Sequence, residues 1–368
     1  MNSKSEKTRA PTFSVPNDSR ISIVMQGLPS TDTKSYLETV RANFPKAEII
    51  LSTWTGTDIA FAKGLVDKVV FSDDPGGLPS AFWEEVISIN NLNRQIVSTV
   101  AGIKAASRPF VMKLRTDFTV NSRKVLDFWN EYPKRDKKYK LFLHRVIIPS
   151  VFSRFYSDET LTPTPFHPSD LFSFGLKKDL LLFYGSAPLA TPEELCAWKY
   201  KFPQHPPYRF SQWRYAPEQA FFVHAARTKF PNIRFDDWTD LHKEELLLSK
   251  QLLLNNFIFL NPGQIGLKSR KHQYALDCAD AGGWKGLILH EVFDGWYHAV
   301  LDPIKTKPAV NGSADQVHPH LFVKSAKERL AVHKARFIQP LRRFVKGLGW
   351  VLEPVVIAYY WTRSRFER

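Results

Sequence analysis

The chain has only two cysteines in its 368 residues, Cys196 and Cys278, and they lie far apart. Two such residues form neither a CxxC zinc motif nor the disulfide framework of a small secreted protein. We therefore expect a reducing, cytoplasmic environment. Because the chain is long and 43% hydrophobic, it can bury a large core without cross-links. Its length fits one large α/β domain or two medium ones.

Long apolar runs are also missing. Nowhere are there about 18 consecutive uncharged apolar residues, the length that a membrane-spanning helix needs. The longest candidate, residues 350–361, is shorter and contains Glu353 and Pro354. The first twenty residues are polar and lack the apolar core of a secretory signal, so residues 1–19 are interpreted as a flexible leader.

Several familiar catalytic motifs are absent. The sequence has no GxGxxG after its first predicted strand, no GxxxxGKS or GxxxxGKT, and no GxSxG. These absences disfavour a dinucleotide-dependent oxidoreductase, a P-loop NTPase and an α/β-hydrolase. The histidines show no HExxH or other metal-binding spacing, so most of them are expected to be structural.

The positive charge is unevenly distributed along the chain. The formal net charge is +15, but residues 324–368 hold eleven Lys or Arg against three acids, which leaves only +7 for the rest. A nucleic-acid-binding domain would carry its positive charge on a globular face. No nucleic-acid partner is therefore expected.

The basic tail has an amphipathic pattern. Pro340 suits a first helical position, and apolar residues then recur at helical spacing while Arg342, Arg343 and Lys346 fall off that stripe. Such a helix fits an anionic membrane surface, where each basic residue adds roughly 1 kcal/mol. A helix packed on the protein's own core, or a dimer contact, would show the same pattern. We predict that residues 324–368 form a membrane-associating tail.

Between leader and tail, short apolar runs alternate with longer helical patterns. This alternation predicts an α/β fold with a doubly wound, mostly parallel sheet, in which ligands bind at the carboxyl ends of the strands. We expect the main domain at residues 20–270 and a helical C-terminal extension at residues 271–323. The predicted strands cover residues 21–25, 48–54, 68–71 and 110–114, and the predicted helices cover residues 33–43, about 92–106 and 218–229.

A charged tripeptide, Arg115-Thr116-Asp117, directly follows the predicted strand at residues 110–114. It places a guanidinium and a carboxylate at the ligand-binding edge of the sheet. When a sugar leaves a sugar nucleotide, negative charge grows on the diphosphate. A divalent cation held by Asp117, or Arg115 itself, can stabilise that charge. An ordinary ion pair at a strand end would give the same tripeptide.

Polar side chains crowd the start of the predicted helix at residues 92–106. They are Asn90, Asn91, Asn93, Arg94 and Gln95. Amides and a fork-shaped guanidinium can bind ribose and phosphate oxygens. An elaborate helix cap is the alternative interpretation.

Two further acids have unusual surroundings. Asp170 lies in the aromatic stretch 166–175, and Glu218 follows Pro217 at the start of a helical run. A carboxylate among apolar neighbours has a raised pKa and can accept a proton from an attacking hydroxyl. Alternatively, Asp170 caps a turn and Glu218 only favours a helix N-terminus.

Several segments, in order between about residues 20 and 260, carry a resemblance to a known family. They are residues 21–27, 48–54, 91–99 with Gly102, 113–117, 167–170 and 217–219. In these segments the chain resembles the WavE-type lipopolysaccharide-synthesis proteins. No resemblance is recognised after about residue 270.

Membership of that family would imply a bacterial glycosyltransferase of the GT-A type. Such an enzyme uses a nucleoside-diphosphate sugar to extend a lipopolysaccharide core, an O-antigen or a capsule glycan. Arg115 to Asp117 stand where GT-A enzymes carry Asp-x-Asp, so Asp117 is the one metal ligand that the resemblance carries over, and dependence on Mn²⁺ or Mg²⁺ stays open. Glu218 resembles the acid that inverting members use as a base beneath the acceptor, and Asp170 is its rival.

The resulting hypothesis is a cytoplasmic enzyme, peripheral on the inner membrane, that transfers a sugar to a lipid-linked glycan. Arg115 and Asp117 would hold the donor's diphosphate. One alternative is a nucleotidyltransferase that forms sugar nucleotides, although residues 26–29 lack the Gly-rich basic loop expected there. The other is a non-catalytic membrane scaffold. The residues expected to bind the nucleotide are Gln26, Gly27, Ser52, Thr53, Trp54, Asn93 and Arg94.

Overall fold

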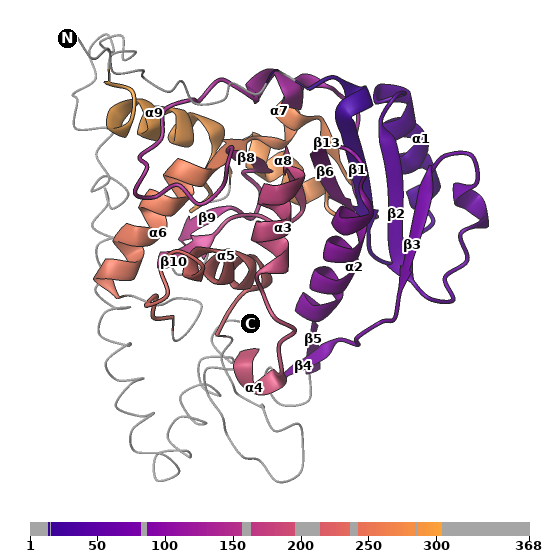
Figure 1. The fold of residues 1–368 in the computed structure, drawn as a ribbon, viewed down its shortest axis with the longest axis horizontal. Helices are drawn as coiled ribbons and strands as arrows, with labels where there is room; N and C mark the ends of the chain where they lie inside the picture. Colours follow the sequence, from indigo (N-terminus) through magenta and orange to yellow (C-terminus); the bar gives the residue numbers. More distant parts are fainter. Residues whose placement is uncertain are drawn as a thin grey trace, which may run out of the picture.

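The computed structural model describes residues 14, 16–81, 87–156, 163–195, 214–235, 242–283 and 286–303 (Figure 1). The predicted tail and most of the predicted leader lie outside these residues. The strands are β1 (Ile21–Gln26), β2 (Glu48–Trp54), β3 (Lys68–Ser72), β4 (Leu78–Ala81), β5 (Ile87–Asn90), β6 (Phe110–Arg115), β7 (Thr119–Val120), β8 (Val146–Pro149), β9 (Arg154–Tyr156), β10 (Pro163–His167), β11 (Phe172–Leu176), β12 (Phe257–Leu260) and β13 (Leu267–Lys268). The α-helices are α1 (Thr33–Asn43), α2 (Leu92–Ala105), α3 (Lys177–Gly185), α4 (Pro192–Leu195), α5 (Pro217–Arg227), α6 (Lys243–Asn256), α7 (Pro262–Ile265), α8 (Gln273–Asp280) and α9 (His290–Val300). Short 3-10 turns are η1 (Asp18–Arg20), η2 (Ala60–Ala62) and η3 (Lys124–Phe128).

A seven-stranded sheet forms the centre of the described chain, in the order β12-β8-β11-β6-β1-β2-β3. Strands β3, β2, β1 and β6 run parallel to one another. All six residues of β1 are buried, and most of them are apolar. This is typical of a central parallel strand that is covered on both faces. This architecture confirms the predicted α/β class with a mostly parallel sheet. The predicted strands and helices of residues 21–114 are also present, with ends that differ by one residue at most.

Helix α2 packs very closely on the parallel strands because it carries a glycine at the contact. A Cβ atom at Gly102 would lie 2.4 Å from Cγ1 of Val24 on β1 and 3.0 Å from Cβ of Ser52 on β2. The Ser52 hydroxyl also donates a 2.7 Å hydrogen bond to the Ser98 carbonyl of α2. This packing fixes the start of α2 above the carboxyl ends of β1 and β2.

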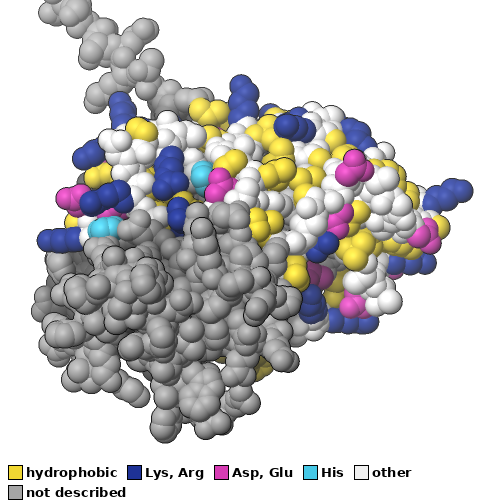
Figure 2. Space-filling model, turned by 90° about the horizontal axis from the view of Figure 1, so that it is seen from below, with side chains coloured by type: hydrophobic (Ala, Val, Ile, Leu, Met, Phe, Trp, Pro, Cys, Tyr) yellow, Lys and Arg dark blue, Asp and Glu magenta, His cyan; other side chains and the backbone are white. Residues whose placement is uncertain are grey.

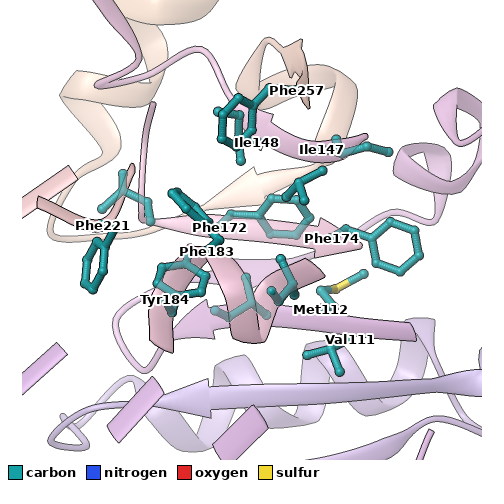
Figure 3. Packing of buried hydrophobic residues seen from close by; sticks show 14 of the residues in the cluster. Val111, Met112, Ile147, Ile148, Phe172, Phe174, Phe183, Tyr184, Phe221 and Phe257 are labelled. Carbon is teal, nitrogen blue, oxygen red and sulfur yellow. The ribbon is translucent and has the colours of Figure 1, made fainter. Parts of the chain in front are cut away.

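The other half of the sheet departs from the parallel pattern. β11 is antiparallel to both of its neighbours, β6 and β8. Aromatic side chains pack on both faces of this part of the sheet. Phe183 of α3 and Phe221 of α5 meet on one face (Figure 3), whereas Phe174 of β11 packs against Phe110 and Trp129 on the other. The rings of Phe183 and Phe257 meet edge to face at 5.4 Å, and each such pair adds about 0.5–1.5 kcal/mol beyond its buried area.

The described residues after 270 pack on the same domain. β13 pairs with β7, so Leu267 lies opposite Val120 just beyond the end of β6. Helix α8 follows at once, and α9 packs against β12 and α6 at the far edge of the sheet (Figure 1). This path carries residues 269–272 back to the carboxyl end of β6.

Two surface observations concern the predicted partners. None of the described helices is long and apolar enough to cross a membrane. On the described part of the face seen in Figure 2, Lys and Arg side chains lie scattered among Asp and Glu.

Candidate active site

A cavity of about 620 Å³ opens at the carboxyl ends of the parallel strands. This is the edge at which open α/β sheets bind their ligands. A smaller cavity, of about 210 Å³, lies where Leu92 of α2 approaches Ala220 and His224 of α5. Of the residues predicted to bind the donor, the larger cavity is lined by Gln26, Gly27, Trp54, Arg94, Arg115 and Asp117.

Arg115 and Asp117 form a two-pronged ion pair on the cavity wall. Nε of Arg115 donates to Oδ1 of Asp117 at 2.9 Å, and the terminal nitrogen donates to Oδ2 at 2.6 Å. Their side chains stay 25% and 18% exposed, so a ligand in the cavity can reach them. Between them, Thr116 bonds back to the first strand, through its N–H to the Gln26 carbonyl at 3.0 Å and its hydroxyl to the Leu28 carbonyl at 2.8 Å.

Gly27 allows this close approach of the two strand ends. Its φ is +114°, a region that residues with a side chain rarely adopt, and a Cβ there would lie 3.4 Å from the Thr116 hydroxyl. The backbone of Gly27 therefore turns the chain out of β1 into the cavity wall, and its predicted role in donor binding stays a prediction.

Two residues that the sequence did not single out also reach Asp117. Nε2 of His272 lies 3.2 Å from Oδ2 and donates this hydrogen bond, since a carboxylate only accepts. Nζ of Lys271 lies 3.9 Å from the same oxygen. Burial disfavours the charged carboxylate, but the His272 hydrogen bond and the Arg115 guanidinium outweigh it and hold the pKa of Asp117 well below its usual range. Asp117 is therefore ionised at every physiological pH.

The residues around Asp117 do not fit a divalent cation. Mg²⁺ and Mn²⁺ prefer several oxygen ligands, and the described residues contain no group of three or more His, Cys, Asp or Glu that could hold a metal ion. Both oxygens of Asp117 already accept hydrogen bonds from Arg115. A cation bound there would compete with the guanidinium for these oxygens and would meet the positive charge of Lys271.

The start of α2 contributes a second ion pair to the cavity. The Arg94 guanidinium makes three contacts of 2.8 to 3.1 Å with the carboxylate of Asp74 and one of 3.0 Å with the Asn91 side-chain oxygen. Asp74, Asn91 and Arg94 all line the cavity. Gln26 faces the same helix, because its side-chain oxygen accepts a 2.6 Å hydrogen bond from the Ser98 hydroxyl.

Three other residues predicted to bind the donor do not line the cavity. Ser52 and Thr53 are fully buried, and the Ser52 hydroxyl is bonded to α2. Asn93 is also buried, and its side-chain amide both donates to and accepts from the backbone of Ala190, at 2.9 and 2.8 Å. This paired contact ties α2 to the segment after α3.

Replacing Asn93 by alanine is expected to cost about 2 kcal/mol of stability. The change removes both hydrogen bonds and leaves the Ala190 N–H and carbonyl without their partners in a partly buried place. Chemical denaturation of the variant measures the loss. An unchanged denaturation midpoint together with weakened nucleotide binding would contradict this structural role and favour the predicted binding role of Asn93.

The structure brings the two candidate bases into one electrostatic cluster with Arg115. Asp170 precedes β11 by two residues, and the pairing of Phe172 with Leu114 places it beside the end of β6. It is 2% exposed, and its Oδ2 has no hydrogen-bond partner among the described residues. Glu218 lies in the first turn of α5. Neither acid lines the 620 Å³ cavity.

Burial raises the pKa of Glu218 above its usual range, and the negative charge of Asp170 adds to this effect. The fully buried Lys113 of β6 donates a hydrogen bond to the backbone carbonyl of Asp170. Burial lowers the pKa of Lys113 to about 8, although Asp170 opposes the shift. Glu218 therefore keeps its proton to a higher pH than an isolated glutamate would. Glu218 and Asp170 are called the carboxyl pair below.

The described residues thus define an α/β protein with a polar cavity at the carboxyl ends of its parallel strands, lined by Arg94, Arg115 and Lys271 as well as by Asp32, Asp74 and Asp117. The chain belongs to the WavE lipopolysaccharide synthesis family, which matches residues 21–284. This match confirms the resemblance found in the sequence. It extends beyond residue 270, where no resemblance was recognised, and it includes Lys271 and His272.

Comparison with known proteins shows remote structural similarity. No curated protein sequence matches the chain. Among solved structures, the chain is similar to residues 1–349 of S. aureus TarS, at 14% identity and a TM-score of 0.29, covering 56% of this chain and 55% of that one. It is also similar to an active-site mutant of LgtC (11%, 0.30, 67% and 86%) and to a cytidylyltransferase from Leptospira borgpetersenii (13%, 0.28, 61% and 99%). The chain spans about half the length of the TarS structure. TM-scores near 0.3 carry no correspondence between individual residues.

Proposed function

We propose that this protein is a glycosyltransferase of the GT-A type. It would move a sugar from a nucleoside diphosphate to a lipopolysaccharide core, an O-antigen or a capsule glycan. Membership of the WavE family supports a role in lipopolysaccharide synthesis. The observation that carries the chemistry is the Arg115–Asp117 pair, which stands at the carboxyl end of β6 with both side chains on the wall of a 620 Å³ cavity.

The cavity supplies what a sugar nucleotide requires. Gln26, Trp54 and Arg94 offer an amide, an aromatic surface and a charged group for the nucleoside. Arg115, oriented by Asp117, would bind the diphosphate. As the bond between the anomeric carbon and the phosphate oxygen breaks, the electron pair moves to that oxygen, and a preorganised guanidinium stabilises the new charge.

The acceptor hydroxyl must lose a proton as it attacks the anomeric carbon. Glu218, or its rival Asp170, would take that proton, and the raised pKa of Glu218 suits a base that works near neutral pH. Both acids interact electrostatically with Arg115. The proposed base therefore interacts with Arg115, the residue proposed to bind the diphosphate.

The location at the membrane is part of the proposal. The basic residues of the predicted tail at 324–368 would hold the enzyme on the anionic inner face of the inner membrane, next to a lipid-linked acceptor.

A panel of nucleotides tests the proposed function. The melting temperature of the full chain is measured with UDP, GDP, CDP and ADP and with the matching triphosphates. One diphosphate should stabilise the fold by about 2.7 kcal/mol at a concentration of 100 times its Kd. A larger effect from a triphosphate would favour the nucleotidyltransferase. The absence of an effect from all eight nucleotides would leave the scaffold.

A further inference from the structure

The short basic segment Arg270-Lys271-His272 brings Lys271 to the cavity wall although it lies more than 150 residues from Asp117 in sequence. It enters between β13 and α8. Two hydrogen bonds anchor Arg270, one from its N–H to the Tyr36 hydroxyl at 2.8 Å and one from its guanidinium to Asp32 at 2.7 Å. The His272 ring stacks on Phe118 with a centroid distance of 5.2 Å and an interplanar angle of 4°. The residue between these two anchors, Lys271, is therefore held at the cavity.

Lys271 is placed to meet a ligand. Its side chain is 69% exposed and lines the 620 Å³ cavity. Its Nζ lies 3.9 Å from Asp117, a separation that is longer than a hydrogen bond. The ammonium group can thus still donate hydrogen bonds to an anion in the cavity.

The charges at this point sum to an excess of positive charge. Asp117 contributes one negative charge, while Arg115 and Lys271 contribute two positive ones within 4 Å of it. A diphosphate that enters the cavity meets a guanidinium oriented by Asp117 and an exposed ammonium. Together these groups supply the charge that a divalent cation supplies in other phosphate sites.

We propose that Lys271 binds the diphosphate of the donor together with Arg115, and that donor binding and sugar transfer need no divalent cation. This inference rests on the proposed function. In the transfer step, the electron pair of the broken bond stays on the phosphate oxygen. Arg115 and Lys271 neutralise it there through hydrogen bonds from their nitrogen atoms, and the acceptor proton goes to the carboxyl pair.

Calorimetric titration of the full chain with UDP, GDP, CDP and ADP tests the inference. Each titration is run once in EDTA and once in MgCl₂ with MnCl₂. At least one diphosphate should bind in EDTA, with a Kd within about twofold of the value measured with the metals. Lys271→Met should weaken that binding at least tenfold, and Lys271→Arg should restore most of it. Lys268→Met changes an exposed lysine of β13 outside the cavity and should leave the Kd unchanged.

The possible results separate the two proposals. Binding that requires the metals, or an unchanged Kd in Lys271→Met, overturns this inference and leaves the proposed function standing. Binding of none of the four diphosphates in either buffer overturns the proposed function, and this inference falls with it.

Discussion

Replacing Asp117 by asparagine should lower sugar transfer at least 100-fold while the protein stays folded. Asparagine keeps the shape of the side chain but lacks the charge that orients Arg115 and His272. Loss of one preorganised stabilising group in an active site commonly costs 10²–10³ in turnover, or about 2.7–4 kcal/mol. The Arg115–Asp117 pair is partly exposed at the cavity, so its loss should shift the melting temperature by no more than about 4 °C.

Asp67 offers a matched control for this experiment. It pairs with Arg41 at 2.6 Å and accepts a hydrogen bond from the Ile49 N–H. It directly precedes β3 and so lies at the amino ends of the parallel strands, whereas the cavity lies at their carboxyl ends. Asp67→Asn should leave transfer unchanged. Full activity of Asp117→Asn, with transfer measured against a radiolabelled or chromogenic acceptor, would remove the assigned site.

The second large effect concerns the carboxyl pair. Glu218→Gln should lower transfer by 10²–10⁴-fold, the usual contribution of general base catalysis. Burial and Asp170 raise the pKa of Glu218, and a protonated glutamate cannot act as a base. As the pH is lowered, the unmodified enzyme should therefore lose activity at a higher pH than an enzyme whose base is a glutamate of normal pKa. Asp170→Asn removes one source of the shift, so the fall should move to lower pH.

Stability gives an independent measure of the same group. A glutamate whose folded pKa lies above its unfolded value stabilises the fold at low pH, and that contribution is lost as the pH rises from the unfolded pKa to the folded one. Glutamine does not titrate. Between about pH 4 and pH 8, Glu218→Gln should therefore gain stability relative to the unmodified protein as the pH rises, as measured by denaturation at both pH values.

Glu131 provides the control for Glu218→Gln. Glu131 is exposed, and Glu131→Gln should change neither the rate nor its pH dependence. If Glu218→Gln keeps its activity and Asp170→Asn loses it, Asp170 is the base. If both variants keep full activity, the carboxyl pair takes no part in transfer.

The parallel half of the fold could be predicted because each strand there is a short apolar run that ends at a polar residue. The run from Ile21 predicts β1, and the polar step at Gln26 marks its end at the cavity. The antiparallel position of β11 could not be predicted. Strand direction depends on which neighbours pair across the sheet, and the apolar residues Phe172 and Phe174 would suit either direction.

The candidate site was predictable where one segment supplies it. Arg115 and Asp117 are adjacent to a strand end, so the sequence alone places them at the ligand-binding edge. Lys271 and His272 reach the same carboxylate only through the pairing of β13 with β7. About half of the domain's sequence separates these two strands, and no periodicity in the sequence predicts that they pair. Asn93 shows the reverse case, in which a polar residue near the predicted site does not line the cavity. Its side chain instead binds the backbone of Ala190 and ties α2 to that segment.

The most direct measurement is a crystal structure of the protein with the nucleoside diphosphate that stabilises it. The account predicts the diphosphate in the 620 Å³ cavity, with phosphate oxygens within hydrogen-bond distance of the Arg115 guanidinium. A nucleotide seated in the 210 Å³ cavity beside α5, or elsewhere with Arg115 still bound only to Asp117, would contradict it.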